Sequence, residues 1–326
     1  MLHVSPLLKR SPPTLRYIGK RLLRALFSLV IIITVVFCLV RMMPLDGYFP
    51  NIDRMSEIQI HNGLEKLGLN DPLHIQLWNF FRQLLRGDLG VSTRYRVNYP
   101  IIKIFAQKAP ISLKFGVLAD AIAIPLGLIL GVLMARRKSG LWDKFGTVFI
   151  VLMQALPGAI YYLFVQMYGV DLFNLSFLYN PDKPSSMILP IVSMAMPGVA
   201  YFAMWMRRYT VDETNRDYIK LARAKGVPNI AIWFRHVFRN AIVPLVQLIP
   251  NWIVFSVAGS IFVEALYSIP GMGGLLVDVI KRQDNAMVQA LVIIFAVLSI
   301  ASLLVGDLLM AFVDPRISLT KKEASR

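Results

Sequence analysis

The chain has 326 residues, of which 56% are hydrophobic, and it combines a mean hydropathy of +0.58 with a formal net charge of +16. Several apolar runs reach about 20 residues, the length that crosses a hydrocarbon core of about 30 Å, and this excludes an ordinary soluble protein. The single cysteine, Cys38, excludes an intrachain disulfide. The composition therefore predicts an all-α integral membrane protein.

Six apolar segments are expected to cross the membrane as helices. In chain order they are Leu22–Val40, Ile111–Met134, Phe145–Tyr168, Met187–Met206, Ile242–Val263 and Met287–Val313. The first is interpreted as a retained anchor rather than a signal peptide, because its apolar run is too long and no A-x-A cleavage site follows. Prolines inside the later spans do not argue against them, since packed membrane helices tolerate proline.

The segments between the spans suggest a division of the chain into regions. We expect a cytoplasmic tail (1–21), a first transmembrane helix (22–42), an extracytoplasmic cap (43–99), a transmembrane domain of five helices with an inside loop at 207–240 (100–313), and a cytoplasmic tail (314–326). The cap region mixes turn residues with two amphipathic runs, near Ser56–Leu67 and His74–Leu85. A short helix, Ile101–Lys108, is expected to lead into the second span.

Lys and Arg are concentrated in alternate connections between the spans. With the N-terminus inside, the basic clusters fall in the N-terminal tail, in the turn at 136–138 and in the loop at 207–240. The short outside loops hold only Lys183, Lys281 and Arg282. This asymmetry follows the positive-inside rule and predicts that both termini lie in the cytoplasm. Because topology accounts for the positive charge, nucleic-acid binding is not expected.

Motifs for catalysis are missing from the sequence. It has no G-x-x-x-x-G-K-[ST] loop for a nucleotide, no H-E-x-x-H zinc motif and no G-x-S-x-G nucleophile elbow. Its four histidines are scattered and have no set of cysteines beside them. We therefore expect no catalytic, cofactor or metal site in this chain.

Few ionisable residues lie inside the expected spans. Asp120 lies near the middle of the second span, and Asp307 lies near the cytoplasmic end of the sixth. Asp120 either pairs with a polar group on another helix or lines a solvated path, since intramembrane acids are costly and persist mainly for function. Met153 and Met194 are further candidates for lining a path, and ordinary packing is the alternative for both.

The sequence RDYIKLARAKGVPN, residues 216–229, stands out in the expected inside loop. It predicts one or two helical turns from Tyr218 to Lys225. Gly226 is expected to end this helix in a left-handed conformation, and Pro228 prevents the helix from resuming.

Small residues alternate with charged ones along this short helix. Ala222, Ala224 and Gly226 would let another backbone come close, and Tyr218, Leu221 and Ala222 are expected on one face. A basic interfacial helix resting on anionic lipid would explain the charges but not the small residues. A short rigid knob that meets a protein partner explains both.

This stretch resembles the EAA-type coupling loop of ABC importer inner-membrane permeases, in the D-Y-x-x-x-A-R-A-K-G form of the oligopeptide, dipeptide and nickel group. Similar segments cover nearly the whole chain. They are RYIGKRLLRALFSLVIIITVVF, LGLNDPLHIQLWNFFRQLLRGDLGVS, APISLKFGVLA, RHVFRNAIVPL, EALYSIPGMGGLLVDVI and the terminal DPRI. The chain departs from the general pattern at Lys220-Leu221, where Glu-Ala would stand, in the extension before Arg16, and at Asp120.

The resemblance to the B-type permease subunit implies a six-helix, type I ABC importer (MetI-like) permease fold in the inner or plasma membrane of a prokaryote. It implies a path for oligopeptides or dipeptides formed with a second, C-type permease. It also implies two cytoplasmic ATPase subunits that bind ATP and Mg²⁺, and an extracytoplasmic peptide-binding protein. The residues implied in ATPase coupling are Asp217, Tyr218, Leu221, Ala222, Arg223, Ala224, Lys225 and Gly226.

Two alternative functions stay open at this point. A nickel or other small-solute importer belongs to the same family, but the spans offer Cys38, Asp120 and few other metal ligands. An ion-coupled secondary carrier would transport without any ATPase. The SIPGMGG segment at 268–274 either supports the sixth span as a turn or contacts the binding protein or the peptide.

Overall fold

The computed structural model describes residues 15–49, 52–257 and 261–313, so parts of both expected tails, with the terminal DPRI motif, lie outside the described residues. Helices dominate the described ranges, which confirms the all-α class. Within those ranges the β structure consists of one short antiparallel pair, β1 (Val91–Ser92) and β2 (Tyr99–Pro100).

The helices fall into a long set and a short set. The long helices are α1 (Leu15–Arg41), α4 (Ile101–Arg136), α5 (Leu141–Ala155), α6 (Gly158–Phe173), α7 (Ile188–Thr214), α11 (Val243–Val257) and α14 (Asn285–Val313). The short helices are η1 (Leu45–Tyr48), η2 (Ile52–Arg54), α2 (Glu57–Lys66), α3 (Leu73–Leu85), η3 (Pro184–Met187), α8 (Asp217–Ala224), α9 (Asn229–Ile232), the π-helical η4 (Trp233–Phe238), α10 (Arg239–Ala241), α12 (Ile261–Leu266) and α13 (Met272–Lys281).

Five of the six expected spans appear as helical segments long and apolar enough to cross a membrane, among the residues described. The third expected span differs, because the chain bends by 115° between α5 and α6, and these two helices make a sixth span only as a bent pair. Proline explains the break. The residue before a proline is pushed out of the helical region, and Leu156, before Pro157, is extended with a ψ of 133°.

α4 is one continuous helix, and the expected separate helix at 101–108 is its beginning. Its two inner prolines, Pro110 and Pro125, do not interrupt it. α4 packs closely on α7 at Gly127 and Gly131, where a Cβ would lie 2.8 Å and 2.6 Å from the backbone oxygens of Val199 and Ala203. Small residues permit such a close approach of membrane helices.

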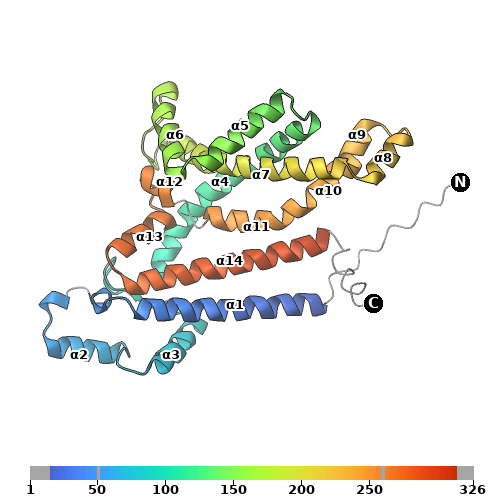
Figure 1. Ribbon diagram of the computed structural model, residues 1–326. Helices are drawn as coiled ribbons and strands as arrows, with labels where there is room; N and C mark the ends of the chain where they lie inside the picture. The colour runs from blue at the N-terminus through green and yellow to red at the C-terminus, as the bar shows by residue number, and fades with distance from the viewer. Residues whose placement is uncertain (1–14, 50–51, 258–260, 314–326) are drawn as a thin grey trace.

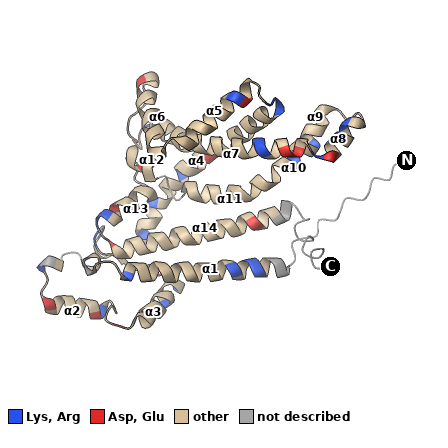
Figure 2. Cartoon of the chain, viewed as in Figure 1, with Lys and Arg blue, Asp and Glu red and all other residues tan. Residues whose placement is uncertain are grey.

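The long helices α1, α14, α11 and α7 run side by side in Figure 1, and the two ends of the bundle differ. α8 and α9 project at one end, whereas α2, α3 and α13 lie at the other. Charged residues gather toward these two ends in Figure 2, and the helices between them are almost entirely uncharged. Which end faces the cytoplasm stays a prediction from the loop charges.

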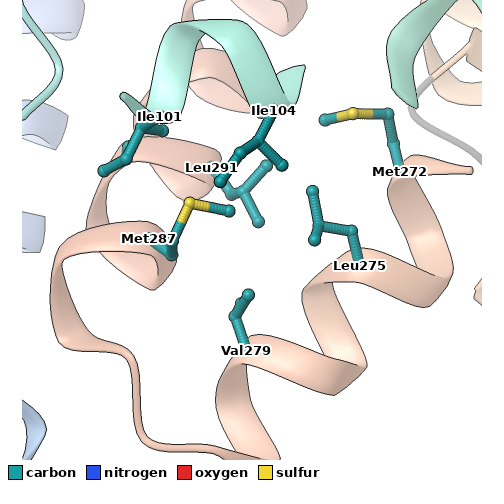
Figure 3. Packing of buried hydrophobic residues seen from close by; sticks show 8 residues of the cluster. Ile101, Ile104, Met272, Leu275, Val279, Met287 and Leu291 are labelled. Atoms are coloured by element: carbon teal, nitrogen blue, oxygen red, sulfur yellow. The ribbon is translucent and has the colours of Figure 1, made fainter. Parts of the chain in front are cut away.

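The first turn of α4 packs against α13 and α14. Ile101 and Ile104 of α4 are fully buried and meet Leu275 and Val279 of α13 and Leu291 of α14 in one cluster (Figure 3). This apolar contact explains why the helix begins at Ile101, well before the expected span.

Asp284, which precedes α14, joins the segment at 43–99 to the bundle. Its carboxylate is fully buried and accepts six hydrogen bonds of 2.6–3.1 Å. The donors are the N–H groups of Thr93, Arg94, Tyr95 and Met287 and the hydroxyls of Ser92 and Thr93. Burial alone would raise the pKa of Asp284, but these hydrogen bonds hold the pKa below its usual range. We call this contact the Asp284 latch.

Candidate functional site

α8 lies between two sharp bends of the chain. Arg216 has an extended backbone (φ −65°, ψ 145°), and α8 begins at the next residue. At the other end Gly226 has a φ of +74°, the left-handed value that glycine adopts without strain. The N–H of Val227 bonds to the carbonyl of Ala222 at 3.1 Å, as in a helix C-terminal motif. The predicted helix and its glycine stop are confirmed.

The inner side of α8 packs on the helices that follow it. Ile219 is fully buried against Ile232 of α9 and Val237 of η4, with Ala222 partly buried beside it. Ile219 was not predicted from the sequence as a buried residue, although its spacing of three from Ala222 marks a shared helical face. This small core fixes α8 to the chain that leads into α11.

The outer side of α8 is exposed and mixes apolar, small and charged residues. Tyr218 is 41% exposed and Leu221 is 56% exposed. We define the outer face of α8 as Asp217, Tyr218, Leu221, Ala224 and Lys225, all exposed. The expected single face of Tyr218, Leu221 and Ala222 is wrong in one respect, because Ala222 turns inward beside the buried core.

Hydrogen bonds connect α8 with the helices on either side of it in sequence. The side-chain amide of Asn240, in α10, donates to the hydroxyl of Tyr218 at 2.8 Å and to the carboxylate of Glu213, in α7, at 3.1 Å. Asn240 of α10 therefore joins α8 to α7. Neither Asn240 nor Glu213 was singled out from the sequence, because nothing local indicates a contact over 22 or 27 residues.

The charges of the segment are exposed. Lys220 pairs with Asp217 at 2.9 Å, and the hydrogen bond from Lys220 lowers the pKa of that carboxyl. Arg223 lies on a different side from the outer face and borders a groove of about 910 Å³. The end of α4, Trp142 of α5 and the segment from α9 to η4 form the rest of this groove, whose exposed apolar lining includes Ile230 and Phe234.

An ion pair between a buried carboxylate and a partly exposed guanidinium joins α5 to α7. The guanidinium of Arg207 donates two hydrogen bonds, of 2.6 and 3.0 Å, to the carboxylate of Asp143 in α5. The N–H of Ser139 also donates to this carboxylate, at 2.9 Å. The pair fixes the turn between α4 and α5 against α7, close to the chain that leads to α8.

Two of the three path candidates lie at one cavity. Its volume is about 410 Å³, and its lining includes Met194 and Tyr201 of α7 and Trp252 and Ser256 of α11. Asp120 is buried behind Ser256, whose hydroxyl donates to the Asp120 carboxylate at 2.9 Å. The second oxygen of this carboxylate has no hydrogen-bond partner among the described residues.

Met153, the third candidate, lies elsewhere. It packs against a cluster that includes Met134, Ile150 and Ala203, and it does not line the cavity. The helical spacing of the methionines could not separate these two environments.

Glu264 of α12 holds the SIPGMGG segment in place. Its buried carboxylate accepts hydrogen bonds from the hydroxyl of Ser112 at 2.5 Å and from the N–H groups of Gly273 at 2.7 Å and Gly274 at 3.2 Å. A Cβ at Gly271 would lie 2.5 Å from this carboxyl group, so the turn needs glycine there. The expectation of a supporting turn agrees with this arrangement.

Comparisons with known proteins identify the family. Residues 127–319 match the model described as "Binding-protein-dependent transport system inner membrane component", and residues 14–112 match the N-terminal membrane component model of the same systems. The chain belongs to this family. Since the family is an inner membrane component, the chain is a multi-pass membrane protein.

Full-length relatives of this transport component are known in several bacteria. The chain is 32% identical over 305 residues to the dipeptide transport system permease protein DppB of Lactococcus lactis subsp. cremoris, covering 93% of this chain and 99% of that protein. It is 31% identical over 306 residues to the oligopeptide transport system permease protein OppB of Haemophilus influenzae, covering 93% and 99%.

A solved structure shows the same fold as this transport component. The crystal structure of an amino acid ABC transporter with histidines aligns with a TM-score of 0.50 at 17% identity, covering 63% of this chain and 92% of that chain. This likeness confirms the expected permease fold of ABC importers.

Proposed function

We propose that this chain is the permease subunit of an ATP-driven importer of oligopeptides or dipeptides in the inner or plasma membrane of a prokaryote. Relatives named for dipeptide and oligopeptide transport support peptides over nickel or another small solute. In this proposal a second, C-type permease completes the path, and an extracytoplasmic binding protein delivers the peptide. Two cytoplasmic ATPases bind ATP and Mg²⁺, and this chain catalyses no reaction.

The outer face of α8 carries the proposal. It combines exposed apolar side chains, Tyr218 and Leu221, with a small one, Ala224, on a helix that projects from one end of the bundle (Figure 1). A small residue beside apolar ones suits insertion into a groove of a protein partner, since the partner backbone can come close. We assign that partner to the ATPase subunits.

The hydrogen bonds of α8 suggest how an ATPase movement reaches the path. Asn240 links Tyr218 to Glu213, and so links α8 to both α7 and α10. α7 and α11 both line the 410 Å³ cavity, through Tyr201 and Trp252 among others. A push on α8 would move these two helices together and change the shape of the cavity between them, which is a coupling between distant sites.

The cavity beside Asp120 is proposed as part of the peptide path. The aromatic rings of Tyr201 and Trp252, 4.7 Å apart, give it surfaces that many side chains can contact. The carboxylate of Asp120 lies behind Ser256 and would attract cationic groups of the peptide. Met194 lines the same cavity, whereas Met153 lies outside it and packs in a separate cluster.

The coupling role is tested by adding bulk to the outer face. Ala224→Trp places a large ring where the partner backbone must come close. The variant should insert and fold normally, because the position is exposed and outside the spans. Peptide uptake and substrate-stimulated ATP hydrolysis should be lost, and the ATPases should co-purify poorly with the permease.

Charge-removal variants are the control for this test. Lys220→Ala and Arg223→Ala remove charge without adding bulk, so uptake should fall less than in Ala224→Trp. If the charge removals abolish uptake while Ala224→Trp assembles and transports normally, the segment is a lipid-binding surface and the coupling role is wrong. Uptake that continues without any ATPase would instead indicate an ion-coupled carrier.

The orientation is tested separately with single cysteines in a Cys38→Ser background. Asn229→Cys and Asp182→Cys are both at exposed positions. A membrane-impermeant thiol reagent applied to intact cells should label position 182 and not position 229. Labelling of position 229 would reverse the proposed topology.

A charge substitution tests the role of Asp120. Asp120→Asn keeps the shape of the side chain and removes its charge. Uptake of Lys- and Arg-rich peptides should fall more than uptake of neutral peptides. Equal losses for both peptide classes, with normal folding, would exclude charge recognition and leave Asp120 as a structural partner of Ser256.

A further inference from the structure

α3 exposes a large apolar surface although it is too short to cross a membrane. Its 13 residues extend about 20 Å, and a hydrocarbon core is about 30 Å thick. The helix, LHIQLWNFFRQLL, has no Asp or Glu. Among its exposed residues are Ile75 (40%), Trp78 (64%) and Leu85 (87%).

Two sides of α3 have different surroundings. One side, which includes Phe80 and Phe81, is partly buried, and the ring of Phe80 lies 5.2 Å from the ring of Phe37 in α1. The adjacent side carries Ile75, Trp78, Arg82 and Leu85, whose spacing of three, four and three residues forms a line along the helix. We call these four residues the outer stripe of α3.

The contact between Phe80 and Phe37 places α3 at a definite depth. α1 crosses the membrane and ends at Arg41, four residues after Phe37. At 1.5 Å per residue, Phe37 lies about 6 Å inward from the end of the span, and Phe80 packs against it. Interfacial helices bury their apolar side about 5–10 Å into the boundary between head groups and acyl chains. Figure 1 shows α3 beside this end of α1, at the end of the bundle away from α8.

The outer stripe continues an exposed apolar surface of α1. At the level of Phe37, α1 exposes Val35 (50%) and Leu39 (59%), as a membrane span does toward acyl chains. The stripe adds Trp and Arg, the residue types that anchor a helix at a membrane interface. α2 is different: its exposed residues include Glu57, Glu65 and Lys66, which suit water.

We propose that α3 is an interfacial helix whose outer stripe is embedded in the head-group boundary of the membrane leaflet opposite α8. Lipid is the partner that fits, because the stripe combines apolar residues with Trp and Arg beside the exposed apolar side of α1 near the end of its span. The helix would then fix the end of α1 at a constant depth and keep α2 above the bilayer. This inference depends on the membrane location of the chain and not on the transported substrate.

Spin labels on the assembled transporter in lipid nanodiscs test the proposal. Single cysteines at Trp78 and Leu85 of the outer stripe, and at Asn62 of α2 as control, are made in a Cys38→Ala background. All three positions are exposed, so the substitutions should not disturb folding. Collision with oxygen, which enriches in lipid, is compared with collision with a water-soluble nickel chelate. Labels at positions 78 and 85 should collide frequently with oxygen. Their collisions with the chelate should be severalfold less frequent than those of the label at position 62.

Each other result would overturn the proposal. Chelate access at positions 78 and 85 equal to that at position 62 would place the outer stripe in water. Protection of these labels from both oxygen and the chelate would show that protein covers the outer stripe. The second permease would be the cover if protection is present from the start, and the binding protein if protection appears only when the binding protein is added. Peptide uptake by each labelled variant, measured alongside, verifies that the complex is intact.

Discussion

Replacing Asp284 by asparagine removes the charge at the centre of the latch and keeps the shape of the side chain. The amide oxygen of the asparagine can still accept hydrogen bonds from the four groups that donate to Oδ2 of Asp284. These are the hydroxyl of Ser92 and the N–H groups of Thr93, Arg94 and Tyr95. The amide NH₂ then takes the place of Oδ1, where the N–H of Met287 points at it from 3.1 Å. A buried donor left without an acceptor costs about 1–3 kcal/mol. The remaining hydrogen bonds also lose the added strength of a charged acceptor.

Together these losses amount to about 3 kcal/mol for local opening of the latch. Since 1.4 kcal/mol is a factor of ten, opening should become about a hundredfold more frequent. The N–H groups of Thr93, Arg94 and Tyr95 all bond to this carboxylate, so their exchange with deuterium reports the opening directly. Hydrogen exchange followed by mass spectrometry should show faster exchange in the peptide at 90–97 and unchanged exchange in α8.

Asp278→Asn is the matched control. It makes the same chemical change on α13, where the side chain is exposed. If exchange at 90–97 is the same in both variants, the carboxylate of Asp284 does not hold the segment, and the reasoning fails.

Three further changes have predictable effects. The pKa of Asp284 is depressed in the folded protein, so the stabilisation by its carboxylate is complete above the unfolded pKa near 4 and is lost as the pH falls below that value. The frequency of latch opening, corrected for the intrinsic exchange rate, should therefore not vary between about pH 5 and 8. Gly271→Ala forces a Cβ against the carboxyl of Glu264 and should lower the thermal unfolding temperature, whereas Gly274→Ala, with its nearest neighbour at 3.7 Å, should have little effect. Arg207→Gln leaves the buried carboxylate of Asp143 without its cation and should destabilise the fold by about 2–3 kcal/mol in thermal unfolding. Adding Asp143→Asn to this variant should recover most of the lost stability.

Local signals in the sequence predicted much of the fold. The apolar runs indicated the spans, because the thickness of a bilayer sets the length of a helix. The order of Ala224, Lys225, Gly226 and Pro228 indicated where α8 ends, because glycine and proline act on the backbone in place. The same kind of signal was present at Pro157 but was treated as tolerated inside one span, although its effect on Leu156 breaks the helix.

Contacts between distant residues could not be predicted in this way. Ser92 and Asp284 are 192 residues apart, and Ser112 and Glu264 are 152 residues apart. An isolated acid between two helices looks the same in a sequence whether it is exposed or accepts six hydrogen bonds. The outer face of α8 was partly misassigned for a related reason, because the burial of Ile219 depends on residues that fold back onto it later in the chain.

The joint between α5 and α6 limits what can surround the bundle there. The last carbonyls of α5 have no N–H partners within their own helix, and Pro157 has no N–H to offer. Hydrocarbon cannot satisfy such groups, and irregular backbone at membrane depth is tolerated only against protein or water. Gln154, Ala155 and Pro157 are exposed at this joint. An annulus of acyl chains around the subunit must therefore be interrupted at this point, by a neighbouring polypeptide or by a hydrated crevice.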